Sequence, residues 1–170
     1  MSQNINIYKI PNFLKHKENL IHLIFKIPQT YVQNNFESIS HTDWQITKTM
    51  KREYEEYFMT HIFQDFAKSF GSKYKFNKIL CTSIWFQVYA KNDFHMTHTH
   101  PKCNFSNVLY IELPNNNLIT NIHDLNDNKI DINIEEGNII TFPSFYRHNS
   151  PKNTTDKSKI VISFNTDVEI

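Results

Sequence analysis

Glycine and cysteine are almost missing from this sequence, and neither sign of charge is in excess. Only two glycines occur in 170 residues, so most tight turns must use asparagine, which tolerates the left-handed backbone better than other non-glycine residues. The asparagine clusters within 115–117 and 126–128 are therefore predicted turns. Two cysteines are too few for a disulfide scaffold, which indicates a reducing compartment.

The charge balance and the lack of long apolar runs argue against two further classes of protein. Eighteen basic and seventeen acidic side chains leave a formal charge of +1, so no strong field attracts nucleic-acid phosphates or an anionic membrane. No apolar stretch approaches the roughly 18 to 20 residues that span a bilayer, and the N-terminus lacks a signal-peptide pattern. We therefore expect a cytoplasmic protein that binds neither membranes nor nucleic acid.

Hydrophobic patterning predicts helices followed by a run of short strands. A strand is expected over residues 5–10, a helix from Pro11 to Ile24, and an aromatic-striped helix from about Thr47 to Phe70, with Gly71 as its stop. Further strands are predicted at 79–89, 107–113, 118–123, 130–134, 138–142 and 159–165. Short strands without intervening helices are typical of a β-barrel or sandwich. The chain is thus predicted to be one α+β domain over 1–170, with a helical part over about 1–75 and a barrel core over about 78–167.

Two histidine-containing segments carry the strongest chemical signal. In His98-Thr99-His100-Pro101 the histidines are two residues apart, so on a strand both imidazoles project to the same face. In the second segment Gly137 predicts a tight turn with positive φ, residues 138–142 alternate like a strand, and His148 is expected just past a strand end. Imidazole suits iron, zinc, copper or nickel, so three histidines predict a metal site and leave the metal open.

Five stretches of the C-terminal half match a known family in order and spacing: 85–89, 94–101, 106–110, 137–148 and 159–165. Through them the chain resembles the 2-oxoglutarate/Fe(II) oxygenases of bacteriophages and marine bacteria, whose fold is a double-stranded β-helix, a jelly-roll or cupin-like barrel. Thr42-Asp43-Trp44 is a weaker match to the same proteins. The resemblance implies a dioxygenase that uses Fe(II) and O2, decarboxylates 2-oxoglutarate to succinate, and oxidises a second substrate, most simply by hydroxylation.

The resemblance also implies that His98, His100 and His148 hold the Fe(II) and so carry catalysis. The wider superfamily uses two histidines and one carboxylate, in the pattern His-x-Asp, whereas this chain and the branch that it resembles have His-x-His. Either three histidines suffice, or a carboxylate completes the site, for which Asp124 and Glu112 are the candidates.

The co-substrate is implied to meet a basic residue that follows the third histidine and is usually arginine. The matching position here is Lys159, with Ser163 on the same strand face. Lysine supplies the charge but lacks the planar fork of arginine, so 2-oxoglutarate is expected to bind more weakly or differently. Gln87 and Tyr110 are further candidate contacts of the co-substrate. Trp85 and Tyr89 share a strand face with Gln87, and they either line the pocket or pack the barrel core.

Neighbours of the three histidines are expected to play lesser parts. Cys103, three residues after His100, is more simply a bystander than a thiolate ligand. His95 lies at an odd spacing from His98 and is therefore predicted to sit off its face, at the rim, as is His123.

Two other functions use the same residues. A cupin would hold metal with the three histidines without 2-oxoglutarate, and it would be indifferent to Lys159, although the glutamate of its first motif has no counterpart after His100. A non-catalytic jelly roll would hold a structural ion and bind a ligand between aromatic side chains. The primary substrate is expected to be a small metabolite or a protein residue, and a nucleobase is the alternative that the charge balance supports least.

Overall fold

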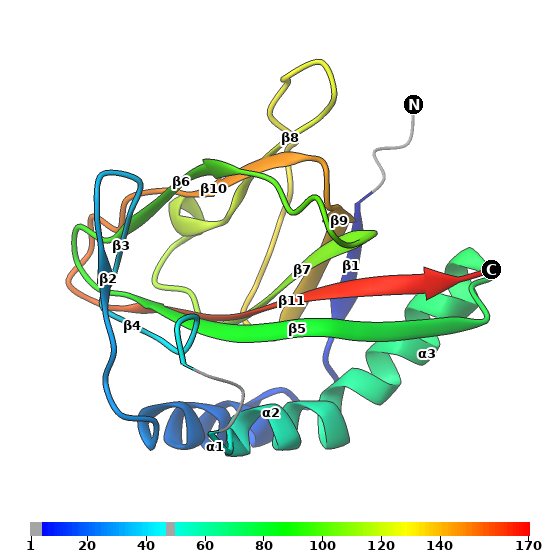
Figure 1. Cartoon of the computed structure of the whole chain (residues 1–170), viewed down its shortest axis with the longest axis horizontal. Helices are drawn as coiled ribbons and strands as arrows, with labels where there is room; N and C mark the ends of the chain where they lie inside the picture. The colour runs from blue at the N-terminus through cyan, green and yellow to red at the C-terminus, as the bar shows by residue number, and fades with distance from the viewer. Residues whose placement is uncertain (1–4, 47–49) are drawn as a thin grey trace.

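The structure is a computed structural model that describes residues 5–46 and 50–170, and in them two antiparallel sheets face each other (Figure 1). The larger sheet has the order β1 (Asn6–Lys9), β9 (Asn138–Pro143), β7 (Phe105–Glu112), β11 (Lys159–Glu169), β5 (Lys78–Tyr89) and β4 (His41–Thr42). The smaller sheet has the order β2 (Val32–Gln33), β3 (Glu37–Ile39), β6 (Phe94–His98), β10 (Arg147–Ser150) and β8 (Asn121–His123). This is the predicted α+β, double-stranded β-helix fold.

Strict alternation along the central strands gives the larger sheet two different faces. In β5, Ile84, Phe86 and Val88 belong to the apolar core beneath the helices, whereas Trp85 and Gln87 line a cavity between the sheets. Strand β11 pairs with β5 along its length and alternates in the same way. Because successive side chains of a strand point to opposite faces, one set stabilises the domain and the other is available for chemistry.

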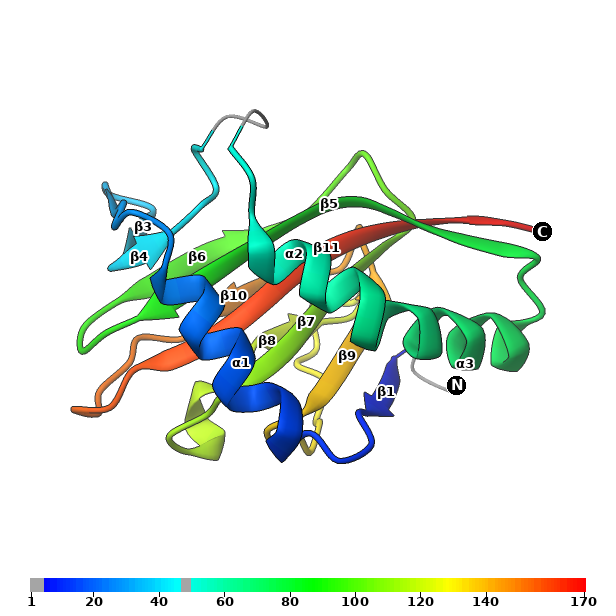
Figure 2. The same cartoon turned by 90° about the horizontal axis from the view of Figure 1, so that it is seen from below.

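Helices α1 (Leu14–Phe25), α2 (Glu53–Phe58) and α3 (Gln64–Tyr74) cover the outer face of the larger sheet (Figure 2). A π-helical turn, Met59–Phe63, joins α2 to α3, and the predicted aromatic stripe packs on the sheet through Phe58, Phe66 and Phe70. No helix in the described parts of the chain is long and apolar enough to cross a membrane.

The second helix differs from the prediction at both ends. Its predicted start at Thr47 lies outside the described residues, and the observed helix begins at Glu53. Gly71 does not stop it, because α3 continues to Tyr74 and ends where Lys75 adopts a left-handed φ of 60°. Gly71 instead lies against the chain that returns to the sheet, where an added Cβ would approach the Phe76 carbonyl oxygen to 3.2 Å.

The predicted strand at 130–134 is wrong. Residues 130–134 are irregular, since the isolated bridge between His123 and Lys129 lies before them, and the isoleucines at 130 and 134 are buried between the sheets. The predicted strand at 118–123 begins only at Asn121, after a 3-10 turn at Asn116–Leu118. Alternating isoleucines therefore indicated burial correctly here but not backbone pairing.

Asp43 fixes the segment that leads into the site. Its fully buried carboxylate accepts hydrogen bonds from Arg52 Nη1 at 2.9 Å, from the Tyr54 hydroxyl at 2.5 Å and from the Phe86 backbone N–H at 2.9 Å. A buried carboxylate needs such partners because desolvation is costly. The contacts hold this segment against β5, where the Trp44 ring packs edge-on to Trp85 at 4.9 Å between centroids.

Gly137 is the position where a side chain is least tolerable. It adopts the predicted positive φ, 81°, and an added Cβ would lie 2.5 Å from Cγ of Phe13. We expect Gly137→Ala to lower the free energy of unfolding by roughly 2 to 4 kcal/mol, since it combines backbone strain with overpacking. Urea unfolding of both proteins would measure this, and a loss no larger than that of an exposed alanine substitution would contradict it.

Candidate metal centre

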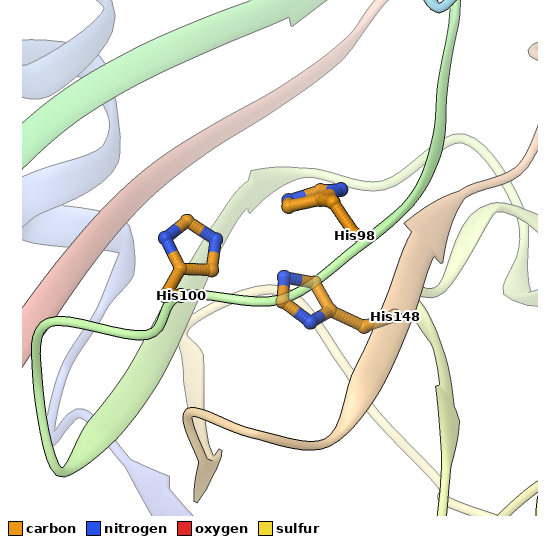
Figure 3. A group of neighbouring side chains, drawn as sticks. All are labelled: His98, His100 and His148. Carbon is orange, nitrogen blue, oxygen red and sulfur yellow. The ribbon is translucent and has the colours of Figure 1, made fainter.

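Three histidines from β6, β10 and the turn after β6 converge on one point (Figure 3). His98 ends β6 and is the direct cross-strand partner of His148, which follows the strand predicted at 138–142 and itself lies on the short strand β10. His100 lies beyond β6, and its backbone N–H donates to the Ser144 carbonyl at 2.9 Å. One ring nitrogen from each histidine lies within 4.8 Å of the others.

Backbone contacts orient two of the three rings. His98 Nδ1 lies 2.8 Å from the Met96 carbonyl oxygen, and His148 Nδ1 lies 3.0 Å from that of Tyr146. A carbonyl can only accept, so each Nδ1 carries the proton and each Nε2 keeps a free lone pair. The His100 ring stacks on Trp85 with centroids 5.7 Å apart. Such outer contacts fix the tautomer and direction of metal-binding histidines.

The protonation state also suits metal binding. Burial lowers the pKa of His98, lowers that of His100 to about 4, and lowers that of His148 well below its usual value. Repulsion by His98 adds to the effect on His100 and His148. The rings are therefore neutral at pH 7, as ligands must be.

The cluster contains no carboxylate among the described residues, so neither Glu112 nor Asp124, the two candidate carboxylates, is one of its members. Glu112 forms an ion pair with Lys17, and Asp124 caps an exposed turn by accepting from the backbone N–H groups of Asn126 and Asn128. Three neutral nitrogens on one side of a point fit Fe(II) and other divalent metals, and they leave positions for further ligands.

His95 faces the site, contrary to its predicted place off the His98 face. A β-bulge is the reason, because Met96 and Thr97 of β6 oppose the single residue Asn149 of β10. The extra residue turns His95 inward, and its ring stacks on His98 with centroids 4.0 Å apart. Burial lowers its pKa to about 3. Bulges recur beside active sites, where they redirect a side chain.

Lys159 lies in the same cavity and has no carboxylate partner among the described residues. Its side chain is fully enclosed, with 1% of the residue exposed, and Nζ donates to Ser150 Oγ at 2.9 Å. The ammonium lies 5.1 Å from the ring centre of Tyr89 and 5.8 Å from that of Tyr110. Burial lowers the pKa of Lys159 to about 7. An enclosed ammonium without a counter-ion is costly unless an anion joins it.

The structure brings two of the remaining predicted residues to the cavity and directs a third elsewhere. Ser163 Oγ donates to Gln87 Oε1 at 2.9 Å, and both residues line the cavity. The Tyr110 hydroxyl donates to Thr120 Oγ1 at 2.8 Å and accepts from its N–H at 3.0 Å. Thr120 therefore lines the cavity where a hydroxyl of Tyr110 was expected.

Some lining residues were not predicted. Ser150 lies two residues after His148 and Asn165 two after Ser163, so strand alternation would have found both once β10 and β11 were known. Cys103, by contrast, is not in the cluster, and burial raises its pKa, as suits a bystander.

Solved structures with the same fold include 2-oxoglutarate/Fe(II) oxygenases. An oxidoreductase of that family from Burkholderia pseudomallei is 12% identical, with a TM-score of 0.76 over 96% of this chain and 85% of that one. A prolyl-4-hydroxylase from Pseudomonas putida is 11% identical, with a TM-score of 0.65 over 98% and 93%. A viral collagen prolyl hydroxylase from Paramecium bursaria Chlorella virus-1, in a 2-oxoglutarate complex, is 14% identical, with a TM-score of 0.61 over 99% and 98%.

Neither a protein-family profile nor a curated protein matches the sequence. At these identities the likeness establishes the double-stranded β-helix fold, which hosts many activities.

Proposed function

We propose that this protein is an Fe(II)- and 2-oxoglutarate-dependent dioxygenase of the kind found in bacteriophages and marine bacteria, and that it hydroxylates an as yet unidentified substrate. Enclosed Lys159, facing the same cavity as the three histidines, carries the proposal. Bound Fe(II) would hold the keto acid and activate O2, which is the oxidant: one oxygen atom would enter succinate as CO2 leaves 2-oxoglutarate, and the other would be available to hydroxylate the substrate. His98, His100 and His148 are its proposed ligands.

The other cavity residues have parts that follow from their positions. Lys159 would donate to the far carboxylate of 2-oxoglutarate, which supplies the missing negative charge. Ser163 and Gln87 would complete the polar wall beside it, while Tyr110 would act mainly by holding Thr120 and by presenting its ring to the ammonium. Burial of Lys159, at 1% exposed, and of His148, at 5%, would limit the access of water to the bound co-substrate.

A cupin without 2-oxoglutarate and a metal-stabilised binding protein remain the alternatives, and both leave Lys159 unexplained. The deciding experiment adds Fe(II) and then 2-oxoglutarate to the protein without oxygen and records the visible charge-transfer band of a chelated keto acid. We expect the band in the wild type and its loss in His98→Ala. Iron binding without a band would favour the alternatives.

The proposed role of Lys159 predicts a pH dependence. Its pKa of about 7 in the free protein means that, above that pH, a proton must be taken up before a carboxylate can pair with it. The dissociation constant of 2-oxoglutarate should therefore rise by up to about tenfold for each pH unit above 7. Lys159→Arg keeps its charge over this range and should give a flat profile. Titrations of the anaerobic iron protein would measure both, and a flat wild-type profile would contradict the assignment.

A further inference from the structure

A groove of about 930 Å³ adjoins the cavity at the histidines. The groove and the cavity share His95, His98 and His100 as well as Trp44 and Trp85, but Lys159 belongs to the cavity alone. A molecule in the groove would thus reach the histidines without occupying the space around Lys159, the proposed place of the co-substrate. The volume is in the range of natural ligand sites.

Glu37 gives one end of this groove a negative charge. It is the cross-strand partner of His95, and its Oε2 lies 3.3 Å from His95 Nε2. Among the residues that the structure describes, its other oxygen accepts only from the Asn34 side-chain amide, at 3.3 Å. In the parts of the chain that the structure describes, no lysine or arginine lies within ion-pair distance of Glu37. Because cross-strand partners share a face of the sheet, Glu37 places a carboxylate without a lysine or arginine partner beside His95 at the site.

The rest of the groove does not cancel that charge. Arg52 forms ion pairs with Asp43 and Glu55, whose two negative charges exceed its single positive charge. It also donates to the Ile84 carbonyl at 2.9 Å. Lys102 is the remaining cation among the described residues of the groove wall, and it is exposed to solvent. Trp44 is 50% exposed and packs edge-on to Trp85, so part of its ring is open to a ligand. Aromatic faces attract cations as carboxylates do.

Trp85 adds a second requirement on the ligand. It is 8% exposed and lines both spaces, yet its indole N–H has no hydrogen-bond partner in the described structure. Buried donors are normally paired, so a ligand oxygen that displaces the side chains now covering this N–H would give it the partner that it lacks. A ligand with both a positive charge and a carbonyl or carboxylate oxygen meets the demands of Glu37 and Trp85.

We infer that Glu37, His95, Trp44 and Trp85 form a binding site for the primary substrate, and that this substrate carries an ammonium or guanidinium group as a basic amino acid does, free or in a peptide. The inferred binding site does not depend on the proposed function. Only the statement that its ligand is a substrate rests on that function. Glu37 binds the cation, His95 holds Glu37 in place, and the Trp85 N–H donates to an oxygen of the ligand.

Calorimetry without added iron or 2-oxoglutarate tests the site independently of oxygenase activity. The probes are free arginine and lysine, the same residues in capped tripeptides, and the neutral counterparts citrulline and norleucine in both forms. We expect the cationic probes to bind at least about tenfold more tightly than their neutral counterparts. Tighter binding of the free amino acids would identify the substrate as a free amino acid, and tighter binding of the capped tripeptides would identify it as a residue of a peptide.

Glu37→Gln should abolish this preference, because it keeps the size and hydrogen bonding of the side chain and removes the charge. Glu135→Gln is the matched control, since Glu135 is exposed and pairs with Lys9 outside the groove, and it should retain the preference. Equal binding of cationic and neutral probes, no binding of any probe at millimolar concentration, or an unchanged preference in Glu37→Gln would overturn the inference. A cation preference without a keto-acid band would overturn the proposed function alone.

Discussion

His148→Ala is expected to abolish metal-dependent turnover while the protein stays folded. His148 is 5% exposed and contributes one of three nitrogens, so its loss leaves two ligands and an opening beside them. Loss of an outer partner of a ligand already lowers metal affinity by about 10- to 100-fold, so loss of the ligand itself should cost more than about 100-fold. Equilibrium dialysis against Fe(II), with succinate release as the activity, would measure both effects.

His123→Ala is the appropriate control for this substitution. His123 lies on β8, the neighbouring strand, and contacts Asp127 instead of the cluster. Metal affinity and turnover should therefore be unchanged in it. Full activity of His148→Ala would exclude the three-histidine centre, and equal losses in both variants would show that the effect is one of folding.

Lys159→Met is expected to weaken the binding of 2-oxoglutarate strongly and leave iron binding intact. Removing one partner of a buried charge pair costs about 2 to 5 kcal/mol, which weakens binding by roughly 30-fold or more. Methionine preserves length and apolar volume, so the cavity should keep its shape. The keto-acid band, titrated with 2-oxoglutarate, measures the loss, and Lys91→Met, an exposed lysine paired with Asp156, serves as control.

The same variant should be more stable than the wild type without ligand. In the folded protein the pKa of Lys159 is lowered to about 7, so between pH 7 and its higher unfolded value the unfolded chain binds more protons. Wild-type stability therefore rises with pH through this window, by up to about 1.4 kcal/mol per unit, and this rise should disappear in Lys159→Met. Thermal unfolding at several pH values would measure it. A less stable Lys159→Met protein with the wild-type pH profile would assign Lys159 a structural role.

The sequence predicted those features that depend on local pattern. Alternation over 79–89 and 159–165 located the two central strands, the aromatic stripe located the helices that cover them, and Gly137 marked a turn with positive φ. Each of these signals arises within one element, where a period of two or of about 3.6 residues reports which side is buried.

Short strands and irregular segments could not be located from the period of the hydrophobic residues. Strands β2, β3, β4 and β10 have two to four residues and, unlike the equally short β1, were not marked by an alternating run in the sequence. At 130–134 alternation reported buried isoleucines without a partner strand, because burial and not pairing produces the pattern.

The residue types of the site came from the sequence, and their relations came only from the tertiary structure. The sequence by itself determined that His98, His100 and His148 are candidate ligands and that Lys159 shares a strand face with Ser163. Only the folded chain decided that His148 pairs with His98 across two strands, that a bulge turns His95 toward them with its cross-strand partner Glu37 beside it, and that no carboxylate meets Lys159 in the described residues. Register, bulges and the neutralisation of buried charge depend on residues far apart in the chain, so no local pattern records them.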